Sequence, residues 1–242
     1  MVDTQAQLCL FNHPRVLLRD SQVEIRPPLA FQVLVALALS KPRTQSRSEI
    51  ARSLFPGVDP KERRSQLRIV LSHLRKKLHD LGITGVYSES GTDLQLSDAV
   101  SLDAYELIGG NTIARPRLSE YAQPVLVGCQ SRFADRCRAM VKNTVEASLP
   151  SILSQCRNED ELWEITPVLN QLNALYPLSA TVCAAHVAVL KRVHLYEEAT
   201  QEITEFETDW LEAYGAQDRP NVDTLVQKLT LSTHAPTRLG GN

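Results

Sequence analysis

Residues 59–82, DPKERRSQLRIVLSHLRKKLHDLG, decide how the amino-terminal third of the chain folds. The segment opens with Asp59 and Pro60, a capping residue followed by proline at the first helical position, and it closes at Gly82, which suits a left-handed cap. Its apolar residues have the i, i+3, i+4, i+7 spacing of one buried helical face. They are Leu67, Val70, Leu71, Leu74, Leu78 and Leu81. The segment therefore predicts one long amphipathic helix.

A shorter helix is predicted before this segment and a β-hairpin after it. Ser46 and Glu49 have the spacing of a capping box, and Pro56-Gly57 breaks the helix that Ser46 would start. Two β-like pieces, Val86 to Ser88 and Leu94 to Leu96, are joined by a turn-rich loop over 89–93. A short helix, a turn, a longer basic helix and a hairpin form the order of a winged helix-turn-helix.

The rest of the chain predicts two further regions. Gln7 to Phe11 and Arg15 to Ile25 indicate an antiparallel meander, and a largely buried helix should run from Pro27-Pro28 to Lys41-Pro42. After Leu102 no strand is convincing, and helices are expected over about 124–154, 159–176, 178–192, 196–214 and 222–229.

We expect an α+β winged helix-turn-helix domain over residues 1–100, with the boundary near 97–101. Helix pairs joined by tight turns indicate an all-α, tetratricopeptide-like domain over 101–230. The Pro-, Thr- and Gly-containing residues 231–242 predict a disordered tail.

Charge is distributed unevenly along a chain whose net charge is only -2. Residues 1–100 carry 14 Lys and Arg against 10 Asp and Glu, a balance of +4, whereas residues 101–242 carry 12 against 18, a balance of -6. Between Lys41 and His79, 11 basic residues face only three acids. A polyanionic partner should therefore bind to this segment, and the acidic half should repel it.

The polar side of the predicted long helix is basic. Lys61, Arg64, Arg68, Ser72, Arg75 and His79 form one row, with Ser65 and Lys76 beside it. Arg can bind guanine edges, and Ser and Lys can bind phosphates. Taken alone, the row also fits a solvated amphipathic face. Ser46 and Arg47 fit a phosphate site at a helix start, and equally a cap and a solvated charge.

These residues resemble a known family. Leu71 to Leu78, LSHLRKKL, with the strands before it and the hairpin after it, is similar to the winged helix of OmpR/PhoB-type regulators, particularly the SARP-type (antibiotic regulatory protein) activators, over roughly residues 6–100. LYPLS at 175–179, YEEA at 196–199 and Phe206 to Tyr214 followed by Arg219-Pro220 resemble the bacterial transcriptional activation domain that accompanies it.

The resemblance implies a transcriptional activator that binds tandem direct repeats near a promoter in double-stranded DNA and contacts RNA polymerase holoenzyme. It implies DNA contacts by Ser46, Arg47, Lys61, Arg64, Ser65, Arg68, Ser72, His73, Arg75 and Lys76. It also implies a polymerase-contact loop at Phe55, Pro56, Gly57, Val58 and Asp59, which otherwise reads as a plain connector.

Two positions depart from the family pattern. His73 stands where the family usually has Arg, and the hairpin carries Glu89 and Asp93 but no Arg. The sequence leaves open whether the protein activates or represses transcription. A homodimer on DNA also stays open, because no self-complementary patch is evident.

Other function classes find less support. We expect no cofactor, no metal and no enzymatic activity, because no nucleophile, paired carboxylates or phosphate loop has suitable spacing. The pair Cys183 and His186 suits core packing better than zinc, and Trp163, Trp210 and Tyr214 suit core anchors. The main alternative to DNA binding is a protein-interaction adaptor that works through the helical half.

The sequence also predicts where the protein resides. Apolar runs are shorter than the ~18 residues of a membrane span. The five scattered cysteines suit reduced, buried thiols. We therefore expect a bacterial cytoplasmic protein without membrane contact, associated with the nucleoid when bound to DNA.

Overall fold

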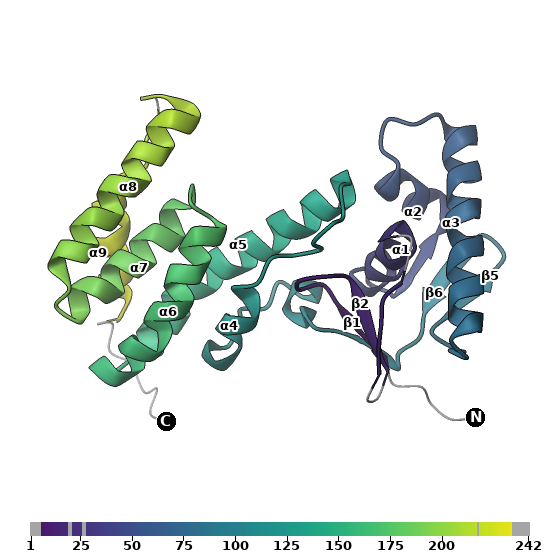
Figure 1. Ribbon diagram of the computed structural model, residues 1–242, viewed down its shortest axis with the longest axis horizontal. Coiled ribbons are helices and arrows are strands. Elements are labelled where there is room, and N and C mark those ends of the chain that lie inside the picture. The colour runs from purple at the N-terminus through teal and green to yellow at the C-terminus, as the bar shows by residue number, and fades with distance from the viewer. Residues whose placement is uncertain (1–5, 19–20, 26–27, 217, 234–242) are drawn as a thin grey trace, which may run out of the picture. The chain divides into compact units, whose positions relative to one another are not determined.

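The computed structural model describes residues 6–18, 21–25, 28–216 and 218–233, which form two compact units (Figure 1). Unit 1 consists of Met1–Asn111 and Pro124–Val141, and unit 2 of Thr112–Gln123 and Lys142–Asn242. This division differs from the single boundary expected near residue 100. Unit 1 runs on to Asn111, and it also includes Pro124–Val141.

Unit 1 begins with a four-stranded sheet in the order β3-β2-β1-β7. β2 pairs antiparallel with both β1 and β3, in agreement with the predicted meander, although residues 19 and 20 lie outside the described residues. β7 pairs in parallel with β1, placing Ala6 opposite Val100 and Leu8 opposite Leu102. The sequence does not predict β7, because this short strand pairs with one at the far end of the unit. The strands are β1 (Ala6–Cys9), β2 (Arg15–Leu18), β3 (Ser21–Val23) and β7 (Val100–Leu102).

Three helices follow β3: α1 (Pro28–Ala38), α2 (Arg47–Leu54) and α3 (Pro60–Asp80). Every residue of α1 from Ala30 to Ala38 is buried, as its apolar sequence predicts; Pro27, its expected start, lies outside the described residues. The predicted capping box at α2 is present. Asp59 caps α3 by accepting a hydrogen bond from the Lys61 amide at 2.8 Å.

The end of α3 follows the prediction closely. The helix stops at Asp80, and Gly82 adopts the left-handed conformation with φ +65°. The Ile83 amide then bonds the Leu78 carbonyl at 2.8 Å, which closes the last turn.

Unit 1 contains a second sheet, with the strand order β4-β6-β5. β5 and β6 follow α3 in the sequence, whereas β4 precedes α2. Its strands are β4 (Thr44–Ser46), β5 (Tyr87–Ser90) and β6 (Asp93–Leu96). The predicted hairpin is present, but its loop is shorter than the expected five residues. Ser90 pairs with Asp93, so only Gly91 and Thr92 lie between the strands. β4 is a further strand that the sequence analysis lacks, and it ends where α2 begins.

The predicted helix over 124–154 begins later than expected, as α5 (Arg132–Gln155). The residues before it form backbone bonds with the end of β1: Leu126 bonds Leu10 at 2.8 Å, and Asn12 bonds Pro124 at 2.6 Å. These bonds hold the segment in a non-helical path, in which Leu126 has φ +50°. Arg138 of α5 then donates to the carbonyls of residues 125, 126 and 129. Tertiary bonding thus replaces the first turns of the helix.

The described part of unit 2 is helical, and its helices pack around one central, buried helix. That helix is α7, whose residues Val182 to Leu190 are all buried, and α6, α8 and α9 pack against it (Figure 1). The helices are α6 (Glu159–Leu175), α7 (Ala180–Arg192), α8 (Tyr196–Tyr214) and α9 (Val222–Thr233). The bounds of α8 match the prediction. α9 extends into the predicted tail, and residues 234–242 lie outside the described residues.

Three short elements lie between β7 and α5 in the sequence. They are two 3-10 turns, η1 (Tyr105–Ile108) and η2 (Arg115–Arg117), and the helix α4 (Leu118–Tyr121).

The five cysteines are free and buried. Among the described residues, no helix combines the length and apolar character that crossing a bilayer requires.

Candidate nucleic-acid interface

The two faces of α3 divide as its sequence predicts. Leu67, Val70, Leu71, Leu74 and Leu78 are buried, whereas Leu81, the last member of the predicted stripe, is half-buried at the helix end. The opposite face is exposed and basic. Its exposed members are Lys61, Arg64, Ser65, Arg68, Ser72, His73, Arg75, Lys76 and His79.

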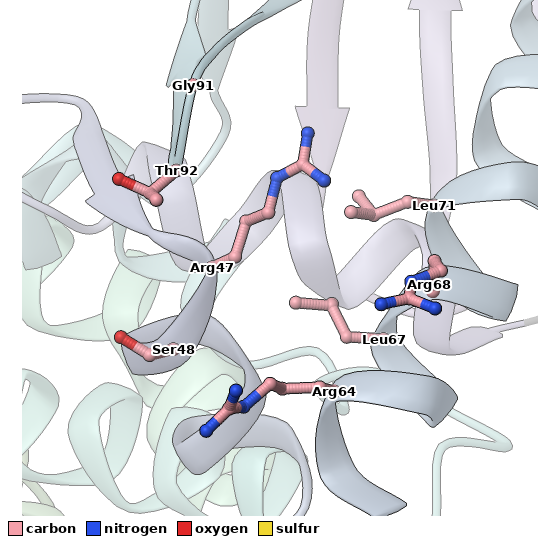
Figure 2. Close-up of a pocket in the computed structure, with 8 residues that line it drawn as sticks. All are labelled: Arg47, Ser48, Arg64, Leu67, Arg68, Leu71, Gly91 and Thr92. Atoms are coloured by element: carbon pink, nitrogen blue, oxygen red, sulfur yellow. The ribbon is translucent and has the colours of Figure 1, made fainter. Parts of the chain in front are cut away.

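A cleft of about 360 Å³ lies between α3, the start of α2 and the hairpin turn. Figure 2 shows Arg64 and Arg68 on α3 at one side, Ser48 and Thr92 at the other, and Arg47 between them, with Leu67 and Leu71 also at the wall. The charged side chains that line it in the described part of the chain are all arginines. The cleft therefore suits an anion such as a phosphate.

The cleft joins three segments that are separate in the sequence. The Arg47 amide donates to the Thr92 carbonyl at 2.8 Å, which fixes the first residue of α2 to the hairpin turn. Gly91, in the turn, has φ +58° and needs the conformational freedom of glycine there. Of the residues that line the cleft, the sequence predicts Arg47, Arg64 and Arg68 as DNA contacts. It does not predict this role for Ser48, Gly91 or Thr92. The turn signal at Gly91 was available, but its proximity to α2 depends on the pairing of β4 with β6.

Acidic Glu89, on β5, partly neutralises this basic surface. Its carboxylate lies 2.5 Å from Arg47 Nη2 and 3.6 Å from Arg75 Nε. Tyr87 donates a hydrogen bond to it at 3.2 Å. Burial, followed by the charge of Glu89, raises the pKa of Tyr87, so this phenol stays a donor at neutral pH. The wing acid noticed in the sequence is thus an ion-pair partner of two predicted DNA-binding residues.

The remaining basic side chains of the row are available to a ligand. Within the described residues, the side chains of Lys61, Arg64, Arg68 and Lys76 form no ion pair. They are the positive charges of α3 that an external polyanion would neutralise.

Ser46, which the sequence predicts either as a DNA contact or as a helix cap, caps the N-terminus of α2. Its hydroxyl accepts a hydrogen bond from the Glu49 amide at 3.2 Å, and its own amide donates to the Glu49 carboxylate at 3.0 Å. The hydrogen bonds from the Ser46 hydroxyl and amide, followed by the charge of Arg52, lower the pKa of Glu49. Capping of α2 therefore accounts for the hydrogen bonds between Ser46 and Glu49.

The loop Phe55–Asp59 is held by local bonds. Arg63 Nη2 donates to the Val58 carbonyl at 2.6 Å, and Gly57 has φ +82°. Gly57 and Asp59 are exposed, whereas Phe55, Pro56 and Val58 are half-buried. The loop thus presents a small surface, partly exposed, next to α3 in the chain.

No family model matches the chain, and no curated protein matches its sequence. Among the solved structures, the chain is similar to "Mycobacterium tuberculosis EmbR in complex with low affinity phosphopeptide". It has a TM-score of 0.61 and 15% sequence identity, and the alignment covers 94% of this chain and 65% of that chain. The chain therefore shares the fold of about two thirds of the EmbR chain.

The other residues that the sequence analysis weighed lie in unit 2. Cys183 and His186 are both buried in α7, and the described residues contain no group of three or more His, Cys, Asp or Glu placed to hold a metal. The expectation that Trp163 and Tyr214 anchor the core is wrong: they are 48% and 61% exposed. Trp210 packs between Phe206 and Tyr214, with ring centroids 5.8 and 4.7 Å apart.

Proposed function

We propose that unit 1 is a winged helix-turn-helix that binds double-stranded DNA, and that the protein is a sequence-specific transcriptional regulator of the SARP type. The observation that carries this proposal is the exposed basic face of α3, which continues into the three-arginine cleft. In a winged helix, α3 would lie in the major groove and the β5–β6 hairpin would be the wing. The likeness to EmbR supports the fold on which this proposal rests.

The geometry supports different roles for the basic residues. Arg68 lies near the middle of α3, where a recognition helix meets base edges, and its fork can bind guanine. Arg47 and Arg64 line the cleft, where one backbone phosphate would be bound by two guanidinium groups. Lys61 and Lys76 would bind phosphates through charge alone.

We propose that unit 2 is a tetratricopeptide-like transcriptional activation domain. Consecutive helices α6, α7 and α8 each pack on the next, as helical repeats do. In this proposal the protein occupies tandem direct repeats, activates transcription and contacts RNA polymerase through residues 55–59. The resemblance of the sequence to SARP-type activators supports these finer steps.

The test is selection of duplexes from a random pool by the purified full-length chain, followed by affinity measurements over a range of salt concentrations. We expect enrichment of a spaced direct repeat. The logarithm of the binding constant should fall steeply with the logarithm of salt, by ~0.9 for each phosphate neutralised. No enrichment, together with no binding at low salt, would reject the proposal and favour a protein-interaction adaptor.

A further inference from the structure

Unit 2 contains a groove that the proposed function does not use. It has a volume of about 450 Å³ and is lined by residues of α6, α7 and α8. Its chemically distinctive members are Trp163 and Asn170 from α6, His186 from α7, and Glu198, Glu202 and Glu205 from α8.

The negative charge of the groove has little internal compensation. Among the described residues, neither Glu198 nor Glu205 forms an ion pair with Lys or Arg; Glu205 accepts one hydrogen bond, from Gln201 at 2.7 Å. From residue 197 to 223 the chain carries nine acids and a single base, Arg219. Arg219 pairs with Glu207 at 3.2 Å, and neither residue lines the groove. The surface therefore attracts a cation.

A buried histidine in the groove lacks hydrogen bonds. His186 is 5% exposed, and within the described residues neither ring nitrogen has a hydrogen bond. Its Nδ1 lies 3.3 Å from a Glu202 oxygen, and Glu202 also accepts a hydrogen bond from Asn173. With the proton on Nδ1, facing the carboxylate, the Nε2 lone pair can accept a hydrogen bond from a ligand. A ligand that donates N–H would satisfy it, whereas an anion would not.

An exposed aromatic ring completes the site for a cationic ligand. The Trp163 side chain lines the groove and is 48% exposed, so one indole face can stack against a guanidinium or ammonium group. Carboxylates beside an aromatic ring suit Arg in particular, which can stack and form a fork of hydrogen bonds at the same time.

The groove is part of a longer surface. A second hollow, of about 680 Å³, lies along α8 and includes the exposed Tyr196 together with Glu197 and Thr204. It shares Gln201 and Glu205 with the groove, so the two hollows adjoin. A surface of this extent matches several residues of a chain better than one small amine.

We propose that the α6–α8 groove binds an Arg- and Lys-rich peptide segment of a partner protein, with one cationic side chain between Trp163 and Glu198. A phosphopeptide, the ligand named for EmbR, would meet like charge here. The proposal goes beyond DNA binding and does not depend on it, because every residue of the groove belongs to unit 2.

The test is fluorescence anisotropy of a short, fluorescein-labelled peptide of alternating Gly and Arg, titrated with the full-length protein at low salt. We expect saturable binding that a Gly-Glu peptide does not show and that free arginine amide displaces poorly. Glu198→Gln combined with Glu205→Gln should weaken binding about tenfold, and Trp163→Ala about threefold. Circular dichroism of each variant verifies folding.

The matched control is the pair Glu212→Gln and Asp209→Asn, which removes two exposed acids from the same helix but outside the groove. We expect it to change affinity less than twofold. Equal weakening by the control pair would show attraction to net charge alone and would overturn the proposal. Absence of saturable peptide binding by the folded wild-type chain would overturn it as well.

Discussion

Arg47 of α2, which lines the arginine cleft, forms an ion pair of 2.5 Å with Glu89 of β5. The second Glu89 oxygen lies 3.6 Å from Arg75 of α3, so one carboxylate bridges two basic residues of the proposed interface. A DNA phosphate near Arg47 or Arg75 would have to compete with this carboxylate. The Glu89 carboxylate thus orients both arginines and lowers the net positive charge of the surface around them.

Removing this carboxylate should strengthen DNA binding. Glu89→Gln keeps one acceptor oxygen, for Tyr87 or for Arg47, but removes a negative charge, so we expect affinity to rise by about 2- to 10-fold. Electrophoretic mobility shift at two salt concentrations measures the change. Asp98→Asn is the control, because Asp98 is an exposed acid of unit 1 that does not line the cleft. Weaker binding by Glu89→Gln would show that ordering of the arginines matters more than their neutralisation.

Arg68 and Lys76 should differ in what they contribute. Arg68→Ala should remove ~1–3 kcal/mol of discrimination at one or two base pairs, because a bidentate contact to guanine would be lost. Lys76→Ala should weaken binding to all sequences about equally and lower the salt slope by about one. Binding to the selected repeat and to single-base variants, each over a salt series, separates the two effects. The same uniform loss for both variants would contradict the assigned roles.

The sequence predicts those elements whose signals are local. Capping residues placed the starts of α2 and α3, and helical periodicity placed α8 between Tyr196 and Tyr214. β4, β7 and the late start of α5 escaped prediction because each depends on a partner distant in the chain. β4 pairs with β6, β7 pairs with β1, and residues 124–127 bond residues 10–12. Short strands of this kind have no periodicity of their own.

The same distinction applies to the candidate site. The basic residues of α3 could be selected from the sequence, because helical spacing alone places them on one face. Their meeting with Arg47 and Thr92 in one cleft, and the pairing of Glu89 with two of them, required the folded β4-β6-β5 sheet. Trp163 was misjudged because periodicity ranks a helical face but does not show which neighbour covers it.

Ser46 provides a test that separates capping from phosphate binding. Ser46→Ala removes the acceptor for the Glu49 amide, so the free energy of unfolding should fall by ~1 kcal/mol. DNA affinity of the folded variant should change less than twofold. Urea unfolding followed by circular dichroism measures the first quantity, and Ser72→Ala, on the exposed face of α3, is the control that should not lower stability, because Ala is the better helix former. A large loss of DNA affinity at unchanged stability would instead assign the Ser46 hydroxyl to a phosphate.

The buried cysteines predict how stability depends on alkaline pH. Burial raises the pKa of Cys137 and of Cys183 from 9.0 to about 12, and that of Cys9 to about 11, so these thiols hold their protons in the folded state. Because the folded pKa exceeds the unfolded one, this stabilisation is complete below pH 9 and is lost as the pH rises from 9 towards 12. We expect the urea midpoint to fall over that range. At pH 8, iodoacetamide should modify the unfolded chain readily and the native protein only slowly. Rapid alkylation of the native protein would show that these thiols are accessible and ionised, contrary to their burial.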